Sequence, residues 1–505
     1  MDTSAFSVLI GRLERESDDN PRAYAFKVGA VAALGYAAIA LVALAILVAC
    51  GFLIAPLLTG GRPRIMTVIS LLGGVVSLLA IVRALWVRIE APQGRELLRE
   101  EVPALFAAID EIVQKMAVRR KGKTQVIRID SVTLNREFNA SIWQIPRWGI
   151  FGNYSNHLQL GVPLLAALSI AEFKTVLAHE IGHFGGAHGK FSAWIYRQRV
   201  TWEELRRKLA EPNGLFEQAL ASFYAWYTPY FDAYTFVLAR NHEYAADRAA
   251  ARATHAKVLA RALIKVDLMG RFLAEVFWKR LFDQIEAHPE PRYLPYSLLP
   301  RVFTMAQKEW SRRDWLDESL RTYASHDDTH PGLGERLAAL DVTPELPTQA
   351  PEKSSLSLLG EQAAVLLQAF DREWADEYLP AWRKRHEAIR EARWKIAQYE
   401  STPASDLKSE DLWEKSTLLL DVGQELDAME TLQLLVGRGD KFGKAHLLLG
   451  RMLLERGNEH GLQNLTHAAL QDPALVEEAG QLGYGYLIER GRKREAQRFW
   501  ERISA

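Results

Sequence analysis

Two long apolar runs near the start of the chain place the strongest limit on its fold. The chain has 31 residues without a charged side chain from Val28 to Leu58, and a further 18 from Ile65 to Val82. Each run is long enough to cross, as a helix, a hydrocarbon core about 30 Å thick. We therefore predict a transmembrane helical hairpin. A buried hairpin of a soluble protein is the alternative, although it would need a very large surrounding core.

The charges around these runs predict the orientation of the hairpin. Lys and Arg are more frequent outside the hairpin than in its turn, so the positive-inside rule places both termini in the cytoplasm. The residues counted are Arg12, Arg15, Arg22, Lys27, Arg83, Arg88, Arg95 and Arg99 outside, against Arg62 and Arg64 in the turn. A third stretch, 216–238, is aromatic but contains Glu217, Pro229 and Asp232. Because such residues are costly inside a bilayer, we expect an interfacial or core helix there.

Charge and cysteine content exclude several classes of site. Lys and Arg together number 62, as do Asp and Glu, so no net positive field favours nucleic acid as a partner. The single cysteine, Cys50, lies inside an apolar run. Neither a disulfide framework nor a thiolate metal site can be built from it. Any metal site in this chain must therefore use histidine and carboxylate ligands.

The segment SIAEFKTVLAHEIGHFGG contains the strongest candidate for such a site. Ser169 and Glu172 have the spacing of a helix-starting capping box, and Gly185 with Gly186 should end the helix. His179 and His183 are four residues apart, which stacks them on one helical face where a single zinc ion can bind both. Two ordinary solvated or core histidines are the alternative. Glu180 follows the first histidine and is the natural general base of this HExxH pattern.

A catalytic zinc ion needs a third protein ligand. The long metzincin pattern would require a histidine at 189, but Gly189 is there and His188 is one residue away. A second route uses the alanine-rich segment LARNHEYAADRAAAR, which should be helical. Glu243 could bind the metal, while Asp247, on the same face, could accept the outer N–H of a ligand histidine. An ordinary solvated helix face is the alternative, and His242 is a weaker candidate ligand.

The chain resembles the HtpX-like and CaaX-endopeptidase-like family of integral-membrane zinc metallopeptidases of the gluzincin type. The resemblance covers roughly 90–340 and is carried by HEIGH, EYAAD and the later segment THPGLGERLAAL. It implies one Zn²⁺ per chain held by His179, His183 and Glu243. It also implies Glu180 as the base and Asp247 as the residue that supports a ligand histidine.

The resemblance suggests roles for residues outside the ligand set. His330 matches a histidine that lies near the metal, where it would stabilise the transition state or occupy the open zinc position at rest. Arg336 would anchor its own segment. The stretch NREFNASIWQIP resembles the edge strand of the family, with Asn139 and Ala140 at its Asn-Ala pair, and an extended substrate could add to such an edge. Alternatively, Asn139 only closes a turn. NHLQLGVPLL (156–165) should be a strand leading into the metal helix.

The C-terminal third has a different organisation. A Pro- and Ser-rich linker is predicted at 343–356 and a charged helical connector at 357–400. Gly423, Gly457 and Gly491 recur at 34-residue intervals, and the last two glycines end the similar segments LLERG and LIERG. This period indicates tetratricopeptide-like helical repeats over 406–505. Their concave surface would bind a peptide or protein partner or support self-association, or the repeats would only pack on the protease domain.

Together these features predict a mainly α protein with an α+β catalytic core. The expected parts are a cytoplasmic segment (1–27), the membrane hairpin (28–88) and a zincin-like metallopeptidase domain with a small β-sheet (89–342), followed by the linker, connector and repeats. We expect a zinc endopeptidase in a membrane such as the bacterial inner membrane, cleaving unfolded or membrane proteins in quality control. A repeat scaffold with a vestigial or structural metal site, and a zinc hydrolase of non-peptide substrates, are the alternatives.

Overall fold

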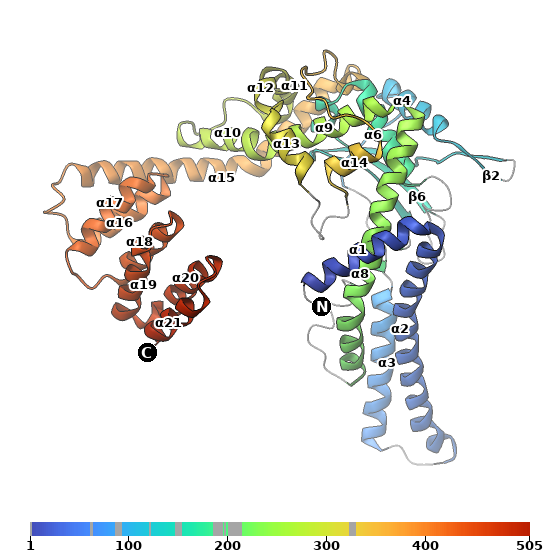
Figure 1. The fold of residues 1–505 in the computed structure, drawn as a ribbon, viewed down its shortest axis with the longest axis horizontal. Helices are drawn as coiled ribbons and strands as arrows, with labels where there is room; N and C mark the ends of the chain where they lie inside the picture. Colours follow the sequence, from blue (N-terminus) through green and yellow to red (C-terminus); the bar gives the residue numbers. More distant parts are fainter. Residues whose placement is uncertain are drawn as a thin grey trace. The chain divides into compact units, whose positions relative to one another are not determined.

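The chain forms two compact units, composed of residues 1–278 with 294–372 and of residues 279–293 with 373–505. The structure is a computed structural model that describes residues 3–60, 64–85, 93–120, 123–146, 154–184, 195, 198–199, 202, 215–322 and 330–504. Both units are mainly helical, and the first also holds a small mixed sheet (Figure 1). This confirms the predicted mainly α fold with an α+β core.

The first unit begins with three helices, α1 (Thr3–Asp19), α2 (Pro21–Leu58) and α3 (Ile65–Leu85). The side chain of Asn20 accepts a hydrogen bond from the amide of Ala23, and Pro21 occupies the first turn, so α2 begins with a favourable cap. Within the described residues, α2 is the one helix long and apolar enough to cross a membrane, and α3 has a shorter apolar stretch, Ile65–Leu79. The two helices pack against each other where the hairpin was predicted.

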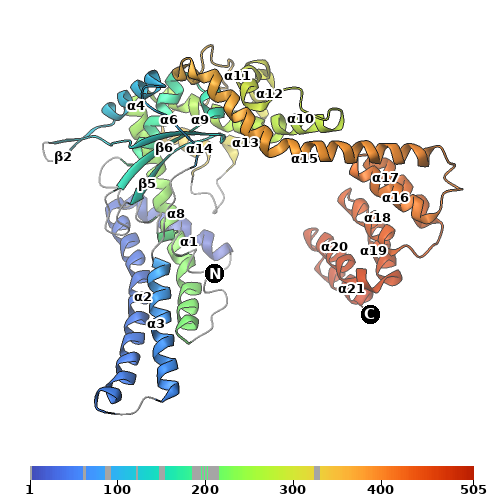
Figure 2. The same ribbon diagram turned by 180° about the vertical axis from the view of Figure 1, so that it is seen from behind.

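The aromatic stretch 216–238 is part of a single long helix, α8 (Leu215–Ala253), which lies along α1 and α2 (Figures 1 and 2). The hydroxyls of Tyr224 and Tyr227 donate to the carbonyls of Gly35 (3.0 Å) and Val31 (2.9 Å) on α2. A Cβ on Gly35 would lie 2.8 Å from both Trp202 and Tyr227, so glycine permits this close packing. The segment therefore packs against protein on one face and continues directly into the EYAAD motif.

The sheet has four strands in the order β1-β4-β6-β5, with β4 parallel and β5 antiparallel to β6. Their bounds are β1 (Arg95–Glu96), β4 (Ser131–Asn135), β5 (Ala140–Pro146) and β6 (Tyr154–Gly161), and a separate hairpin joins β2 (Val118–Arg120) to β3 (Lys123–Gln125). β5 is thus an edge strand, as predicted for NREFNASIWQIP. β6 does not lead straight into the metal helix, because the short buried helix α5 (Val162–Ala167) intervenes.

The helix carrying HEIGH is α6 (Ile170–Gly182), which contacts α4 (Pro103–Lys115), α8 and α9 (Ala256–Phe272). Ser169 and Glu172 form the predicted capping box. The buried carboxylate of Glu172 also lies 3.0 Å from the amine of Lys265 on α9, which fixes the start of α6. The apolar face of α6 is buried and includes Phe173, Leu177, Ala178 and Ile181. The glycines expected to end this helix, at 185 and 186, lie outside the described residues.

The other elements of the first unit surround this core. They are η2 (Leu273–Phe277), α11 (Pro295–Met305), α12 (Gln307–Trp310), α13 (Arg313–Arg321), α14 (Leu333–Ala339) and η4 (Ser355–Leu359). The last part of the predicted linker packs on the core, since Ser355 donates from its amide to Leu168 O (2.7 Å) and from its hydroxyl to Leu165 O (2.9 Å). The domain boundaries expected from the sequence stay predictions.

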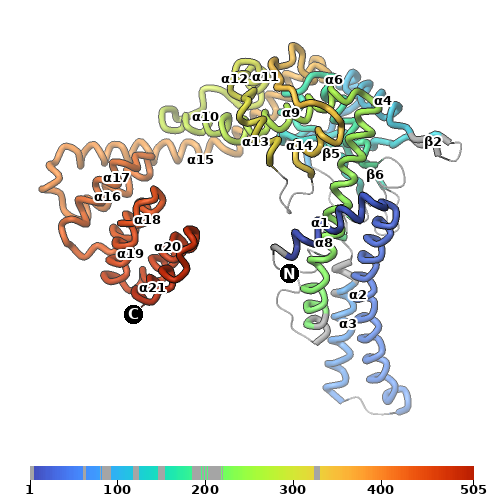
Figure 3. Tube along the Cα trace, in the orientation of Figure 1, coloured from blue at the N-terminus to red at the C-terminus, as the bar shows by residue number. Residues whose placement is uncertain are grey.

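The second unit contains most of α10 (Trp278–Asp283), η3 (Gln284–Glu286) and the later part of α15 (Gln362–Glu400), followed by helices that pack in successive pairs (Figure 3). These helices are α16 (Ser409–Asp421), α17 (Glu425–Gly437), α18 (Gly443–Glu455), α19 (His460–Gln471), α20 (Val476–Glu489) and α21 (Lys493–Ser504), with η5 (Pro473–Leu475) before α20. Gly423, Gly457 and Gly491 follow α16, α18 and α20 with φ of 78°, 74° and 75°. The 34-residue period therefore marks equivalent helix ends that require a left-handed residue.

Candidate metal centre

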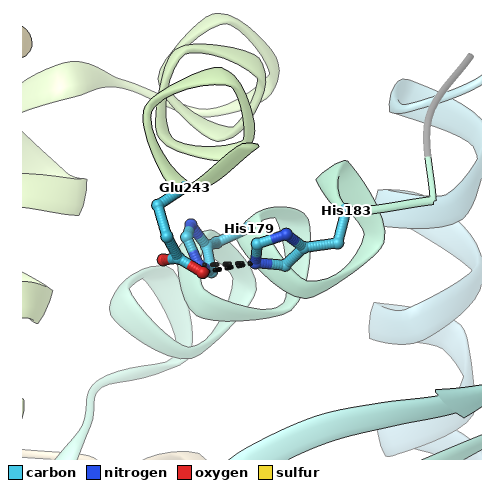
Figure 4. A group of neighbouring side chains, drawn as sticks. All are labelled: His179, His183 and Glu243. Carbon is cyan, nitrogen blue, oxygen red and sulfur yellow. Dashed lines mark hydrogen bonds and ion pairs between the residues drawn. The ribbon is translucent and has the colours of Figure 1, made fainter. Parts of the chain in front are cut away.

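Helices α6 and α8 bring two imidazoles and one carboxylate together (Figure 4). One ligand atom from each of His179, His183 and Glu243 lies within 4.8 Å of the others. The two Nε2 atoms are 3.2 Å apart, and the carboxylate oxygens of Glu243 lie 3.5 Å from His179 Nε2 and 3.3 Å from His183 Nε2. The predicted ligand set is thus assembled from segments 60 residues apart.

Close packing between α6 and α8 sets this geometry. Gly182 ends α6, and a Cβ placed on it would lie 3.1 Å from the Cα of Ala246 and 3.2 Å from its carbonyl oxygen. Ala246 in turn lies between Glu243 and Asp247 on α8. Because a glycine faces an alanine here, the backbones of α6 and α8 approach closely. This brings the histidines of α6 within reach of Glu243 on α8. His183 caps α6 with helical backbone angles, so it keeps the register of His179.

Asp247 and Arg336 support the first histidine from behind. Asp247 Oδ1 lies 2.8 Å from Nδ1 of His179. A proton on Nδ1 satisfies this contact, so Nε2, which faces Glu243 and His183, is the atom that a metal ion would bind in place of a proton. Arg336 donates two hydrogen bonds to Asp247, of 2.8 Å and 2.7 Å, so the carboxylate is held from both sides.

The two histidines and Glu243 influence one another's pKa values. Burial lowers the pKa of His179, but its hydrogen bonds to Asp247 and Glu243 outweigh this effect and raise that pKa to about 9. Burial and the positive charge of His179 lower the pKa of His183 to about 4, so this imidazole is neutral near pH 7. Burial raises the pKa of Glu243, but His179 and His330 outweigh it and lower the pKa well below its ordinary value. A metal ion would replace the proton held on His179.

Glu180 is adjacent to the first histidine on α6 and is partly buried. Burial raises the pKa of its carboxyl to about 7, and the negative charge of Glu243 adds to the rise while His179 opposes it. A carboxyl with such a pKa can both accept and return a proton near neutral pH. A general base must be able to exchange a proton in this way, and the HExxH pattern predicts a general base at Glu180.

His330 also reaches the site, with Nδ1 3.2 Å from Glu243 Oε2 and 61% of its side chain exposed. Thr329, the first residue of the same motif, lies outside the described residues, as do His188 and Gly189. His242, the weaker candidate ligand, is not part of the ligand group and instead lines a pocket of about 360 Å³ between α1, α2 and α8.

Sequence reasoning assigned too small a role to Arg336. It was expected to anchor its own segment, but its guanidinium contacts Asp247 and lies 3.4 Å from Nδ1 of His179. The sequence signal was a single arginine within the THPGLGERLAAL motif, and spacing alone could not show which carboxylate it binds. At the sheet edge, the side chain of Asn139 accepts a hydrogen bond from the amide of Ala140 (2.8 Å). This bond joins neighbouring residues, and both roles of Asn139, in substrate binding and in closing a turn, stay predictions.

The donor set fits zinc. Two imidazoles and a carboxylate form a three-ligand group of the kind that holds catalytic zinc and leaves a fourth position open. The carboxylate of Glu243 is buried, and its nearest partners are the ring nitrogens of His179, His183 and His330. The site therefore has the ligand types that a divalent metal requires.

The middle of the chain matches a known protein family. A search of the curated proteins finds no match to the chain. Residues 106–343, which contain β4, β5, β6, α6, α8 and the His330 motif, match the model of peptidase family M48. The members of that family are zinc metallopeptidases. This region of the chain is therefore similar to peptidase family M48, and the His-His-Glu group lies inside it.

Proposed function

We propose that the protein is a membrane-anchored zinc endopeptidase. The observation that carries the proposal is that ligand atoms of His179, His183 and Glu243 lie within 4.8 Å of one another. Glu180 follows His179 on the same helix. A structural zinc site normally fills all four positions with protein ligands and needs no base. Three ligands next to a carboxyl with a raised pKa favour catalysis over the scaffold alternative. The match to a peptidase family supports peptide bonds as the substrate.

The residues of the site have separable tasks. Zinc, when bound, would polarise the scissile carbonyl and make a water molecule more acidic. Glu180 would accept a proton from that water and deliver it to the departing amine. Asp247 would keep His179 in the tautomer that presents Nε2 to the metal. His330, largely exposed beside Glu243, would donate a hydrogen bond to the negative charge that develops on the substrate oxygen.

The edge strand β5 supports an extended substrate. Its partner β6 covers one side, and no other strand of the described residues pairs with its outer edge. A peptide could add there through main-chain hydrogen bonds, which tolerate many sequences. We propose that β5, beginning at Ala140 next to Asn139, holds unfolded segments of membrane or misfolded proteins. Such a role agrees with quality control at the cytoplasmic face of a membrane.

The helical pairs of the second unit support a partner-binding role of the tetratricopeptide type. A pocket of about 250 Å³ opens among α16, α18 and α20. Its lining combines apolar residues with two cations and one anion, and consists of Trp413, Lys444, Leu447, Leu448, Arg451, Leu475, Glu478 and Leu482. We propose that this surface recruits a substrate or partner protein.

The decisive test removes the base and keeps the metal. Glu180→Gln should retain one zinc per chain, because the ligands are untouched, and should lose cleavage of an unfolded protein such as casein. Wild-type cleavage should stop when a chelator removes the metal. Glu275→Gln, an exposed glutamate paired with Arg271 on the surface, is the matched control and should keep wild-type activity. A folded, zinc-loaded Glu180→Gln protein that cleaves at the wild-type rate would refute the proposed role.

A further inference from the structure

The helix α2 is much longer than a membrane crossing requires. Its 38 residues rise by about 57 Å at 1.5 Å per residue, whereas a hydrocarbon core is about 30 Å thick. About half of α2 must therefore lie outside the hydrocarbon unless the helix is strongly tilted. The side chains along α2 indicate which half that is.

Large exposed apolar side chains are concentrated in the later half of α2 and on α3. On α2 they are Leu41, Leu44, Leu47, Val48, Phe52, Ile54 and Leu58, and on α3 they are Ile65, Met66, Val68, Ile69, Leu72, Val75, Val76 and Leu79. The α2 set spans about 26 Å along the helix, close to the thickness of the hydrocarbon core. These residues form the lipid-facing belt of the hairpin.

The earlier half of α2 exposes a different surface. Between Lys27 and Leu41 its exposed positions are Ala30, Ala33, Leu34, Ala37 and Ala40. Four of these five side chains are single methyl groups, and over the whole earlier half the exposed large apolar residues are Phe26 and Leu34, against seven in the later half. Small side chains are compatible with an aqueous surface, where a row of exposed leucines would be costly.

Protein covers the opposite face of this earlier half. Besides the two tyrosine hydroxyls described above, the side-chain amide of Gln198 donates to Ala32 O (3.2 Å). The helix that provides the tyrosines, α8, carries the partly buried Asp232 on the same stretch, a residue disfavoured in hydrocarbon. Polar groups and a carboxylate at this level fit a protein stalk above the bilayer.

We propose that the hydrocarbon core ends near Leu41 and that the metal centre stands about 35 Å above it on a stalk formed by α2 and α8. Tyr224 meets α2 at Gly35, six residues above Leu41, which corresponds to about 9 Å. From Tyr224 the helix α8 rises 19 further residues to Glu243, about 28 Å. A helix tilt near the usual value of about 20° reduces the sum only slightly.

This height defines a substrate class, and the inference rests on the endopeptidase function proposed above. An extended chain advances at most about 3.5 Å per residue, so a bond must lie at least about ten residues from the hydrocarbon to reach the zinc ligands. The enzyme should therefore cut cytoplasmic tails, long loops and unfolded soluble domains. Bonds within a membrane span or immediately beside it should be out of reach.

The bilayer level is tested by cysteine labelling in nanodiscs, which leave both membrane faces accessible. In a Cys50→Ala background, single cysteines replace Ala30 and Ala33 on the proposed stalk and Leu44 and Leu47 in the belt. A membrane-impermeant maleimide should label the first two and should label the last two only after denaturation. Protection of Ala30→Cys and Ala33→Cys to the same degree as Leu44→Cys would overturn the stalk.

The reach is tested with a single-span substrate in which Gly-Ser linkers of about 4, 8, 16 and 24 residues precede a short casein-derived segment whose one cleavable bond lies between its first two residues, so that the linker alone sets the distance of this bond from the hydrocarbon. The two short linkers should be cut at less than about a tenth of the rate of the two long ones. Equal cleavage behind the shortest and longest linkers would overturn the proposal. The untethered segment is the control. If it is not cut either, the endopeptidase function itself fails, while the labelling pattern still decides the bilayer level.

Discussion

Asp247→Asn should weaken zinc binding while leaving all three ligands in place. The aspartate holds Nδ1 of His179 at 2.8 Å and receives two hydrogen bonds from Arg336. An amide can accept only at its oxygen, so its NH₂ group would face a donor. Loss of such a supporting residue typically reduces metal affinity about 10- to 100-fold, or about 1.4–2.7 kcal/mol. A titration against a chromophoric chelator would measure the change.

The same substitution should also destabilise the metal-free protein. Arg336 is largely buried and would lose its anionic partner, and breaking a buried pair costs about 3–5 kcal/mol. The double variant Asp247→Asn with Arg336→Met should recover melting temperature but not zinc affinity, which separates support of the ligand from support of the fold. Asp110→Asn, which disrupts an exposed pair with Arg99, is the control and should change neither quantity. A folded Asp247→Asn protein with zinc affinity within about threefold of wild type would refute the reasoning.

Three further outcomes are expected. Lys265 holds the pKa of Glu172 below its ordinary 4.5 despite burial, so the stabilisation exists above that pH and is lost as the pH falls through the folded-state pKa. Melting temperature should therefore fall more steeply from about pH 5 to about pH 3 in wild type than in Glu172→Gln, and parallel curves would contradict this. Gly182→Leu should push α6 away from α8 at Ala246 and lower the free energy of unfolding by about 1–3 kcal/mol. A zinc titration should then show weaker binding. Unchanged zinc affinity would argue that this packing does not set the ligand geometry. His330→Ala should lower kcat for casein about 10²- to 10³-fold with nearly unchanged zinc content, and its role would be disproved by wild-type kcat.

The ligand residues could be predicted because their relations are local. His179 with His183, and Glu243 with Asp247, are each four residues apart on one helix, so each pair lies on a single helical face. That the two helices meet depends on the contact of Gly182 with Ala246, which no spacing in the sequence reveals. The resemblance to a known family supplied that long-range relation.

Other features depended on tertiary structure and were missed or only partly foreseen. The sequence predicts an interfacial or core helix at 216–238 and a helix at the EYAAD segment, but not that the two form the single helix α8, in which Pro229 is internal and which packs against α2. The sequence predicts that the segment 156–165 is a strand leading directly into the metal helix, but its end forms the short helix α5, which lies between β6 and α6. Arg336 contacts a residue 89 positions away, and a lone arginine carries no signal of such a partner.

The packing of Gly182 against Ala246 affects how the proposed peptidase would respond to loss of its metal ion. Because backbone contact between two helices holds the ligands together, the apoprotein should keep a ready-made receptor for the ion rather than unfold when it departs. Removal and rebinding of zinc would then be reversible. The proposed peptidase activity would rise and fall with the concentration of free zinc. A domain whose folding depends on zinc could not offer this, because each loss of the ion would expose it to degradation.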